Sequence, residues 1–400
     1  MRDKWLWLLF ILGLLFYAAW TGFVVVTDRP LDYYAYLIAA DAFTHGENIY
    51  LLPNESYAPI AERLGIINYA PPYRYPLLTA LLVWPLLLVP LRLGAAIWVF
   101  GNGLAALVAA LLLGRDADAV WKRRVVLAAA IGYVPILTTM NAGQVNGLVL
   151  LAAAAALYAW QQNRYALSGA WLAVSIWLKL YTAVVAGLMV WRACWRRALV
   201  SALITSIAIT ALSVIAFGWQ PILSQTSIFS KIVVVGGASG GYPPSQNFAN
   251  LIGHWFVPNE YGPPLVNAPQ LASPIYWSLV VAFGVATLAL LWPPGRQVRS
   301  FELEAALLIM TTHLLASSTW YHHLTMVFIA FAVLIKRWPD WRHPHPGMLM
   351  LCVAYVLLAV QGLAWKWFVG YALLLDLATW AGIIVWGLLA VQLRKHPASI

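Results

Sequence analysis

The sequence predicts an all-α fold, a polytopic transmembrane helical bundle with about twelve membrane-spanning helices. Hydrophobic residues make up 62% of the chain and charged residues only 10%. Soluble domains contain about 45–50% apolar and about 25% charged residues. A helix needs about 20 apolar residues to cross the hydrocarbon, and the long uninterrupted apolar runs exclude a β-barrel. We therefore expect residues 1–400 to form a single integral membrane domain.

Hydropathy places the expected helices along the whole chain. They lie near residues 5–26, 76–91, 94–114, 125–140, 145–160, 166–190, 198–218, 274–292, 302–317, 322–336, 346–361 and 370–392. The first of these follows the sequence Met-Arg-Asp-Lys and is too long for the core of a signal peptide. We therefore expect it to be retained as a transmembrane helix.

The net charge of +10 arises from basic residues in the short loops between the spans. Basic residues cluster in the cytoplasmic-type loops, at Arg2, Lys4, Arg192, Arg196, Arg197, Arg296, Arg299, Lys336, Arg337, Arg342, Arg394 and Lys395. This is the positive-inside pattern, so it indicates a bilayer and not a nucleic acid as the partner. With a cytoplasmic N-terminus, the long loops near 27–74 and 219–273 face outward.

The first outer loop holds six of the 14 acidic residues in the chain. Two short helices are expected there, over 31–43 and 55–66, and both are predicted to lie in the membrane interface. Asp32 begins the first of them, beside the membrane. A carboxylate in that position is costly unless it has a function, so Asp32 is the principal catalytic candidate.

Five further polar segments interrupt the apolar sequence. They are Pro71–Pro76, Asn141–Gly147, Trp177–Ala183, Ser245–His254 and Ser318–His323. Lys179 lies within an expected span, where a lysine has to face a cavity or a partner. We expect one of the two adjacent histidines, His322 and His323, to be functional.

Some of these polar residues have simpler roles available to them. An alternative role for Arg74 is to extend its guanidinium group to the membrane surface without binding a substrate. An alternative role for Gln144 and Asn146 is to form hydrogen bonds to neighbouring helices. Asp376, inside the last expected span, is expected to pair with a neighbouring helix.

Carboxylate, histidine and cation together favour group transfer from a lipid-phosphate donor. The chain has no P-loop, dinucleotide fingerprint, nucleophile elbow or His-Glu-x-x-His motif, so ATP, NAD and metalloprotease chemistry have no support. A phosphate leaving group is already acidic and needs no general acid. The reaction needs a base for the acceptor hydroxyl and positive charge to hold the phosphate.

The order of the motifs resembles that of the GT-C glycosyltransferases, and within them glycosyltransferase family 87, of the polyprenyl-phosphate-mannose-dependent type. The matching motifs are Asp32-Tyr33-Tyr34-Ala35-Tyr36 with Gly46-Glu47-Asn48-Ile49-Tyr50, then Tyr75-Pro76-Leu77, Gly143-Gln144-Val145-Asn146, Lys179-Leu180-Tyr181-Thr182, Asn247, and Trp320-Tyr321-His322-His323. The chain departs from the family pattern at Leu77 and Thr182, where the family has proline, and around Asn247.

This resemblance implies a GT-C-type bundle that performs an inverting transfer at the outer face, in a bacterial plasma membrane. A mannosyl or related hexosyl or pentosyl group would move from a polyprenyl phosphate to a lipid or glycan acceptor hydroxyl. Asp32 would be the general base, and His322 the second catalytic residue. The donor phosphate and sugar would be bound by His323, Lys179, Arg74, Tyr36, Tyr75, Gln144, Asn146, Asn247 and Trp320. No cofactor is implied, and without a cluster of acidic metal ligands we expect metal independence.

Two other function classes remain open on the sequence alone. A transporter or lipid flippase would use Lys179 and Asp376 as a path for a substrate at the membrane midplane. A non-catalytic assembly partner would retain its role without Asp32. The polar segments are expected to gather on one face, which favours the transferase over the transporter.

Overall fold

The computed structural model of the protein describes residues 3–67, 71–192, 195–225, 244–292, 300–337, 345–371 and 374–395. Within these ranges every regular element is a helix, which confirms the all-α prediction. The chain forms two compact units. The first unit comprises residues 1–112, 136–183 and 196–234, and the second comprises residues 113–135, 184–195 and 235–400.

The predicted count of about twelve spans is not confirmed. Among the described residues, six helices are long and apolar enough to cross a membrane, namely Lys4–Val26, Leu91–Gly114, Arg196–Phe217, Pro269–Leu291, Pro346–Phe368 and Leu377–Lys395. A seventh is reached if the pair Val120–Ile131 and Val134–Ala142, bent by 41°, is counted as one span. Further apolar segments form helices of 10–17 residues near their expected positions: Leu77–Leu88, Asn146–Gln161, Tyr165–Leu178, Leu180–Trp191 and Tyr321–Lys336.

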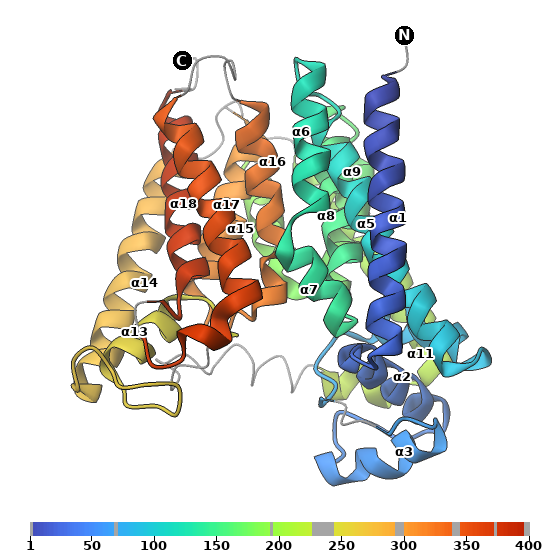
Figure 1. Cartoon of the computed structure of the whole chain (residues 1–400). Coiled ribbons are helices and arrows are strands. Elements are labelled where there is room, and N and C mark those ends of the chain that lie inside the picture. Colours follow the sequence, from blue (N-terminus) through green and yellow to red (C-terminus); the bar gives the residue numbers. More distant parts are fainter. Residues whose placement is uncertain are drawn as a thin grey trace. The chain divides into compact units, whose positions relative to one another are not determined.

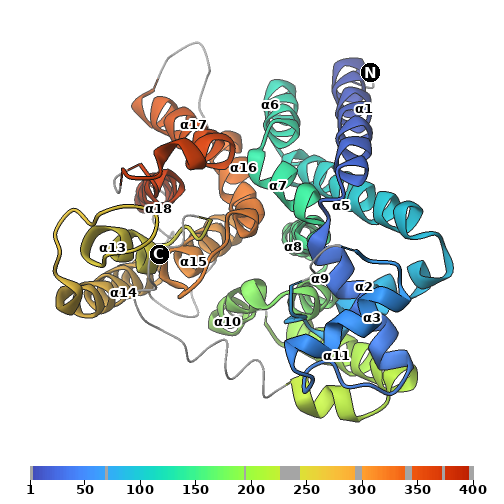
Figure 2. The same ribbon diagram turned by 60° about the horizontal axis from the view of Figure 1, so that its bottom comes forward.

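The first unit is built from long helices with short helices at one end. Its elements are α1 (Lys4–Val26), α2 (Leu31–Thr44), α3 (Tyr57–Arg63), α4 (Leu77–Val83), α5 (Leu91–Gly114), α7 (Val134–Ala142, whose first two residues belong to the second unit), α8 (Asn146–Gln161), α9 (Tyr165–Leu178) and α11 (Trp195–Phe217). Figure 1 shows α1, α5, α8 and α9 running alongside one another, with α2 and α3 at the end where α1 finishes. Figure 2 brings this end forward, with α2 and α3 in front.

The position of α2 differs from the prediction. We expected an interfacial helix with a single apolar stripe, yet every residue from Tyr33 to Phe43 is buried inside the protein. The following helix, α3, keeps a mixed pattern in which Tyr57 and Ile60 are buried. Because α2 is apolar on nearly all sides, packing against α4 and the neighbouring aromatic residues buries more of its surface than an interface would.

The second unit is a bundle of helices from the C-terminal part of the chain. Its elements are α6 (Val120–Ile131), α10 (Ala183–Trp191), α13 (Phe248–Phe256), α14 (Pro269–Leu291), α15 (Phe301–Leu315), α16 (Phe328–Lys336), α17 (Pro346–Ala364) and α18 (Leu377–Lys395). Residues 226–243, which are part of the expected outer loop near 219–273, lie outside the described residues.

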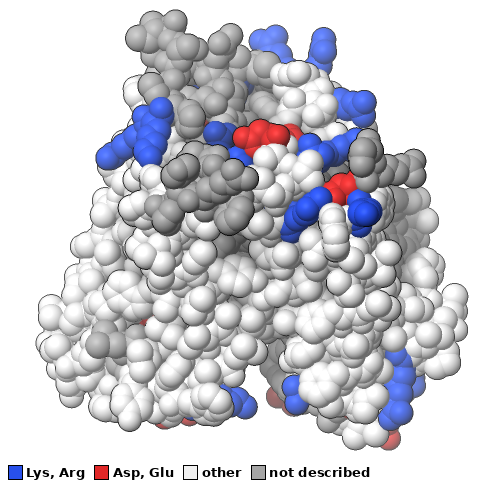
Figure 3. Space-filling view, turned by 45° about the horizontal axis from the view of Figure 1, so that its top comes forward, with Lys and Arg blue, Asp and Glu red and all other residues white. Residues whose placement is uncertain are grey.

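Charged side chains in the second unit pair with one another. Arg192 binds Glu304 through two hydrogen bonds of 2.6 and 3.0 Å, and both side chains are buried. Lys336 binds Asp116 at 2.8 Å and also contacts Glu302. On the face shown in Figure 3, the described residues along the sides of the units are almost all uncharged. Uncharged sides and paired charges are what a hydrocarbon environment requires.

Candidate active site

Two helix breaks in the first unit bring polar side chains together. The first separates α7 from α8 at Gly143, whose φ of +69° disfavours any residue with a side chain. A Cβ on Gly143 would also lie 2.9 Å from the Cβ atoms of Pro30 and Tyr33, so the break packs closely against α2. Gln144 and Asn146 follow directly, and both are buried.

The second break follows α9, at Lys179. We predicted a continuous span over 166–190, but Lys179 has an extended backbone, with φ −164° and ψ 133°, and α9 ends at Leu178. The Lys179 ammonium donates hydrogen bonds to Gln144 Oε1 at 3.1 Å and to Asn146 Oδ1 at 3.0 Å. A break at membrane depth is tolerated where the backbone is buried in protein or lines a cavity. Here it allows a cation to meet the two amides of the neighbouring break.

A directed chain of hydrogen bonds joins this cation to Asp32. Gln144 Oε1 accepts from Lys179 and, at 3.2 Å, from the Tyr36 hydroxyl. Gln144 Nε2 donates to the Tyr75 hydroxyl at 2.7 Å, and Tyr75 donates to Asp32 Oδ1 at 3.3 Å. The sequence predicted all of these residues as site candidates, and the fold brings them into a single network.

Asp32 occupies the first turn of α2 and is partly exposed. Burial by the surrounding protein raises the pKa of Asp32 to about 6, opposed by the Gln144 amide, the Lys179 ammonium and the Tyr75 hydroxyl. A carboxyl group with a pKa close to neutral pH is well suited to accept a proton. Asp32 therefore combines contact with solvent and the proton affinity of a general base.

Aromatic rings surround the network. The Tyr36 ring meets the Tyr75 ring edge to face, with centroids 4.8 Å apart, and meets the Trp98 ring at 5.8 Å. The Lys179 ammonium lies 5.2 Å from the centroid of Tyr75 and 5.4 Å from that of Tyr181. These rings stabilise the cation without neutralising it.

Two of these aromatic residues are ones that sequence reasoning did not assign to the site. Trp98 on α5 donates a hydrogen bond from its indole to Gly143 O at 2.8 Å, which holds the first break in place. No local signal marked Trp98, because its role depends on the packing of α5. Tyr181 lies two residues after Lys179, and that spacing within one motif was an available signal.

Arg74 stands apart from the network. Its side chain is exposed, although the next residue, Tyr75, is part of the hydrogen-bonded chain. No contact of Arg74 with Lys179 or Asp32 is present among the described residues, and its contact with a sugar donor stays a prediction.

The histidine pair belongs to a turn in the second unit. Residues Tyr321–Val327 form a 3₁₀ helix, in which His322 is buried and His323 is partly exposed. Trp320 N donates to His323 Nδ1 at 3.2 Å, and the rings of His322 and His323 lie 4.5 Å apart. Trp320 is exposed, with its ring 5.9 Å from that of His322. The expected juxtaposition of these histidines with Asp32 stays a prediction.

Asn247 has a structural role in the second unit. It caps α13, where its side chain accepts a hydrogen bond from Asn250 N at 2.9 Å. The residue is fully buried, and its Nδ2 has no hydrogen-bond partner among the described residues. Asn247 therefore has no exposed atom for contact with the sugar donor in this structure, and the predicted contact stays a prediction.

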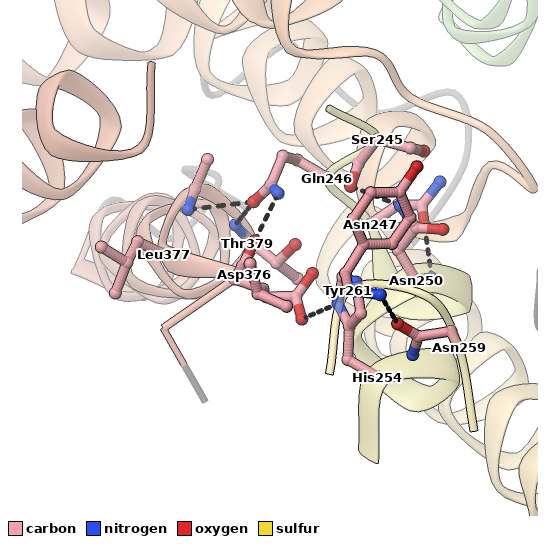
Figure 4. Close-up of polar contacts among 12 residues, drawn as sticks. Ser245, Gln246, Asn247, Asn250, His254, Asn259, Tyr261, Asp376, Leu377 and Thr379 are labelled. Atoms are coloured by element: carbon pink, nitrogen blue, oxygen red, sulfur yellow. Dashed lines mark hydrogen bonds and ion pairs between the residues drawn. The ribbon is translucent and has the colours of Figure 1, made fainter. Parts of the chain in front are cut away.

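Asp376 is buried at the start of α18 and pairs with a neighbouring helix, as the sequence predicted. His254 Nδ1 on α13 lies 2.6 Å from Asp376 Oδ2. Figure 4 shows this pair together with the Ser245–Asn247 segment and the first turn of α18. Asp376 and Lys179 belong to different compact units, and each has partners within its own.

Comparison with known proteins identifies the chain. A sequence profile of glycosyltransferase family 87 matches residues 73–318, more than half of the chain. The matched range contains Tyr75, Gln144, Asn146 and Lys179, whereas Asp32 and the two histidines lie outside it. A search of curated proteins found no match.

Proposed function

Because the chain belongs to glycosyltransferase family 87, and so is a membrane glycosyltransferase, we propose that it is an inverting enzyme that uses a polyprenyl-phosphate sugar, with mannose as the favoured sugar. The acceptor would be a lipid or glycan hydroxyl at the outer face of a bacterial plasma membrane. The observation that carries this proposal is the link from Asp32 through Tyr75 and Gln144 to a buried ammonium. Family membership and this geometry favour transfer over the alternative of a transporter.

In the proposed reaction Asp32 accepts the proton of the acceptor hydroxyl. The hydroxyl oxygen attacks the anomeric carbon of the sugar, and a new C–O bond forms on the face opposite the phosphate. The bond between that carbon and the phosphate oxygen breaks, and the oxygen keeps the electron pair. The products are the glycosylated acceptor, polyprenyl phosphate and protonated Asp32, so no general acid is required.

The leaving phosphate needs positive charge. Lys179 is suited to supply it, because the two side chains that accept its hydrogen bonds are neutral amides. An ammonium has three N–H donors, and we assign the remaining one to a phosphate oxygen of the donor. His322 or His323 would bind the same phosphate, Tyr36 and Tyr75 would contact the sugar, and the reaction would be metal-independent.

The donor class is tested by an assay of the purified protein in lipid vesicles. We expect transfer from polyprenyl-phosphate mannose and none from GDP-mannose. Polyprenyl-phosphate glucose and polyprenyl-phosphate arabinose, run beside them, would identify the sugar. Turnover of GDP-mannose alone, or of none of these donors, would contradict the proposed donor class.

The acid limb of the pH profile should report on Asp32. A base has to be deprotonated, and burial raises the pKa of Asp32 to about 6. On the acid side we therefore expect kcat/KM to fall about tenfold for each pH unit below that value. Among the described residues, the charged and titratable groups that face Asp32 are Lys179, Tyr75 and Tyr36. A profile that stays flat down to pH about 4.5 would contradict this role for Asp32.

A further inference from the structure

The turn that carries the histidine pair is held by a segment far away in the sequence. Tyr321 N donates to Pro244 O at 2.6 Å, and Gln246 N donates to Thr319 O at 2.6 Å. Thr319 N donates to Ser245 Oγ at 3.2 Å, and Ser245 and Trp320 form an isolated antiparallel bridge. Residues 244–246 thus pair with 319–321 and leave the turn little freedom on that side.

The side chain of Gln246 fixes this segment to α18. Its Nε2 donates to Leu375 O at 2.8 Å, and its Oε1 accepts from Ala378 N at 3.2 Å and Thr379 N at 3.3 Å. The amide therefore caps the first turn of α18, where backbone N–H groups lack intrahelical partners. Figure 4 shows these bonds reaching from the Ser245–Asn247 segment to α18.

The segment is also fixed from its other end. Asn247 begins α13, and His254 on α13 lies 2.6 Å from Asp376, directly before α18. Ser245, Gln246 and Asn247 are all buried, with exposed fractions of 4%, 1% and 0%. No side chain of this motif is available to a ligand at the surface, so the motif acts on the turn beside it.

From these contacts we infer that Gln246 is a positioning residue of the transferase: its side chain anchors residues 244–246 to α18, and its backbone holds the turn from Thr319 to His323. This inference rests on the proposed function, in which His322 or His323 binds the donor phosphate. An imidazole binds a phosphate productively only if it is held within about 0.5 Å of the required geometry. A turn of seven 3₁₀ residues does not supply that rigidity by itself.

The matched control is Gln361, which caps the same helix start. Gln361 Nε2 donates to Leu375 O at 2.9 Å, and Leu377 N donates to Gln361 Oε1 at 3.0 Å. Gln246 and Gln361 are equally buried, with an exposed fraction of 1% each. Only Gln246 is also bonded to the 319–321 segment. Gln361→Met thus reproduces the loss of a cap on α18 without releasing the turn.

The experiment compares four single variants with the wild type, using polyprenyl-phosphate mannose in vesicles. They are Gln246→Met, Gln361→Met, His322→Ala and His323→Ala. The two glutamine variants should lower the thermal unfolding midpoint by similar amounts. Gln246→Met should raise the KM for the lipid donor at least fivefold and leave the KM for the acceptor unchanged, whereas Gln361→Met should leave both within twofold. Gln246→Glu, which keeps the oxygen that accepts from Ala378 N and Thr379 N but loses the donor to Leu375 O, should recover part of the affinity for the lipid donor.

The possible failures are distinguishable. Equal donor KM values for Gln246→Met and Gln361→Met would overturn the positioning role, provided that at least one histidine variant raises the donor KM. If neither histidine variant changes the donor KM, the assignment of the histidines is wrong and the inference falls with it. Absence of transfer by the wild-type protein would overturn both this inference and the proposed function.

Discussion

Replacing Asp32 by Asn is expected to reduce kcat/KM for sugar transfer by about 10²–10⁴-fold, the contribution of a positioned general base. The substitution keeps the size of the side chain and leaves an oxygen to accept the Tyr75 hydroxyl, which now lies 3.3 Å from the carboxylate. It removes the group that takes the acceptor proton. Because folding is preserved, the loss should appear in kcat and not in the amount of folded protein. The measurement is initial-rate kinetics on vesicle-reconstituted protein at pH about 7.5, well above the pKa of Asp32.

Glu47→Gln provides the control for Asp32→Asn. Glu47 is a partly exposed carboxylate of the same loop, 3.7 Å from Arg63, and it has no contact with the network. Its neutralisation should change kcat/KM by less than about twofold, since exposed ion pairs contribute little. If Asp32→Asn retains more than about a tenth of the wild-type rate, the loss is smaller than the usual effect of removing a general base. That result would rule out this assignment.

Replacing Lys179 by Met should cost about 10²–10³-fold in kcat/KM, the usual effect of losing one preorganised group that stabilises developing charge. Methionine fills a similar volume between Tyr75 and Tyr181, but it cannot stabilise the departing phosphate. A second consequence follows from the charge. The Lys179 ammonium lowers the pKa of Asp32, so its removal should raise that pKa and move the acid limb of the profile to higher pH. The measurement is the pH dependence of residual kcat/KM in the variant.

Lys122→Met is the matched control for Lys179→Met. Lys122 is also a buried lysine, but it binds Asp118 at 2.7 Å in the second unit. Its loss should lower stability while the pH profile keeps its wild-type position. An unchanged acid limb in Lys179→Met would mean that Lys179 and Asp32 do not interact, and the proposed site would have to be revised.

The sequence determined the class of the protein and singled out the candidate site residues. A chain with 62% hydrophobic residues has no soluble alternative, and a carboxylate or lysine among apolar segments is retained only for a function. Asp32 and Lys179 were therefore recognisable as site candidates from their surroundings. The family match over residues 73–318 confirmed the resemblance that their order had indicated.

Local patterns misplaced the breaks and the buried helices. Lys179 was assigned to the middle of a span, because hydropathy averages over a window and does not detect one extended residue. The aromatic residues of α2 matched an interfacial helix equally well, and only the presence of α4, α5 and the break at Gly143 shows that they are buried. No signal in the sequence indicated that Asn247 caps α13, because that role depends on where the helix begins.

By itself, the sequence determined an all-helical membrane protein, because composition depends on what each residue costs in hydrocarbon, and the order of its motifs indicated glycosyltransferase family 87. The tertiary structure alone decided that Lys179, Gln144, Tyr75 and Asp32 form one network, and that Gln246 links the histidine turn to α18. These contacts join residues far apart in the chain. Their formation depends on where helices break and how they pack, which no local pattern encodes.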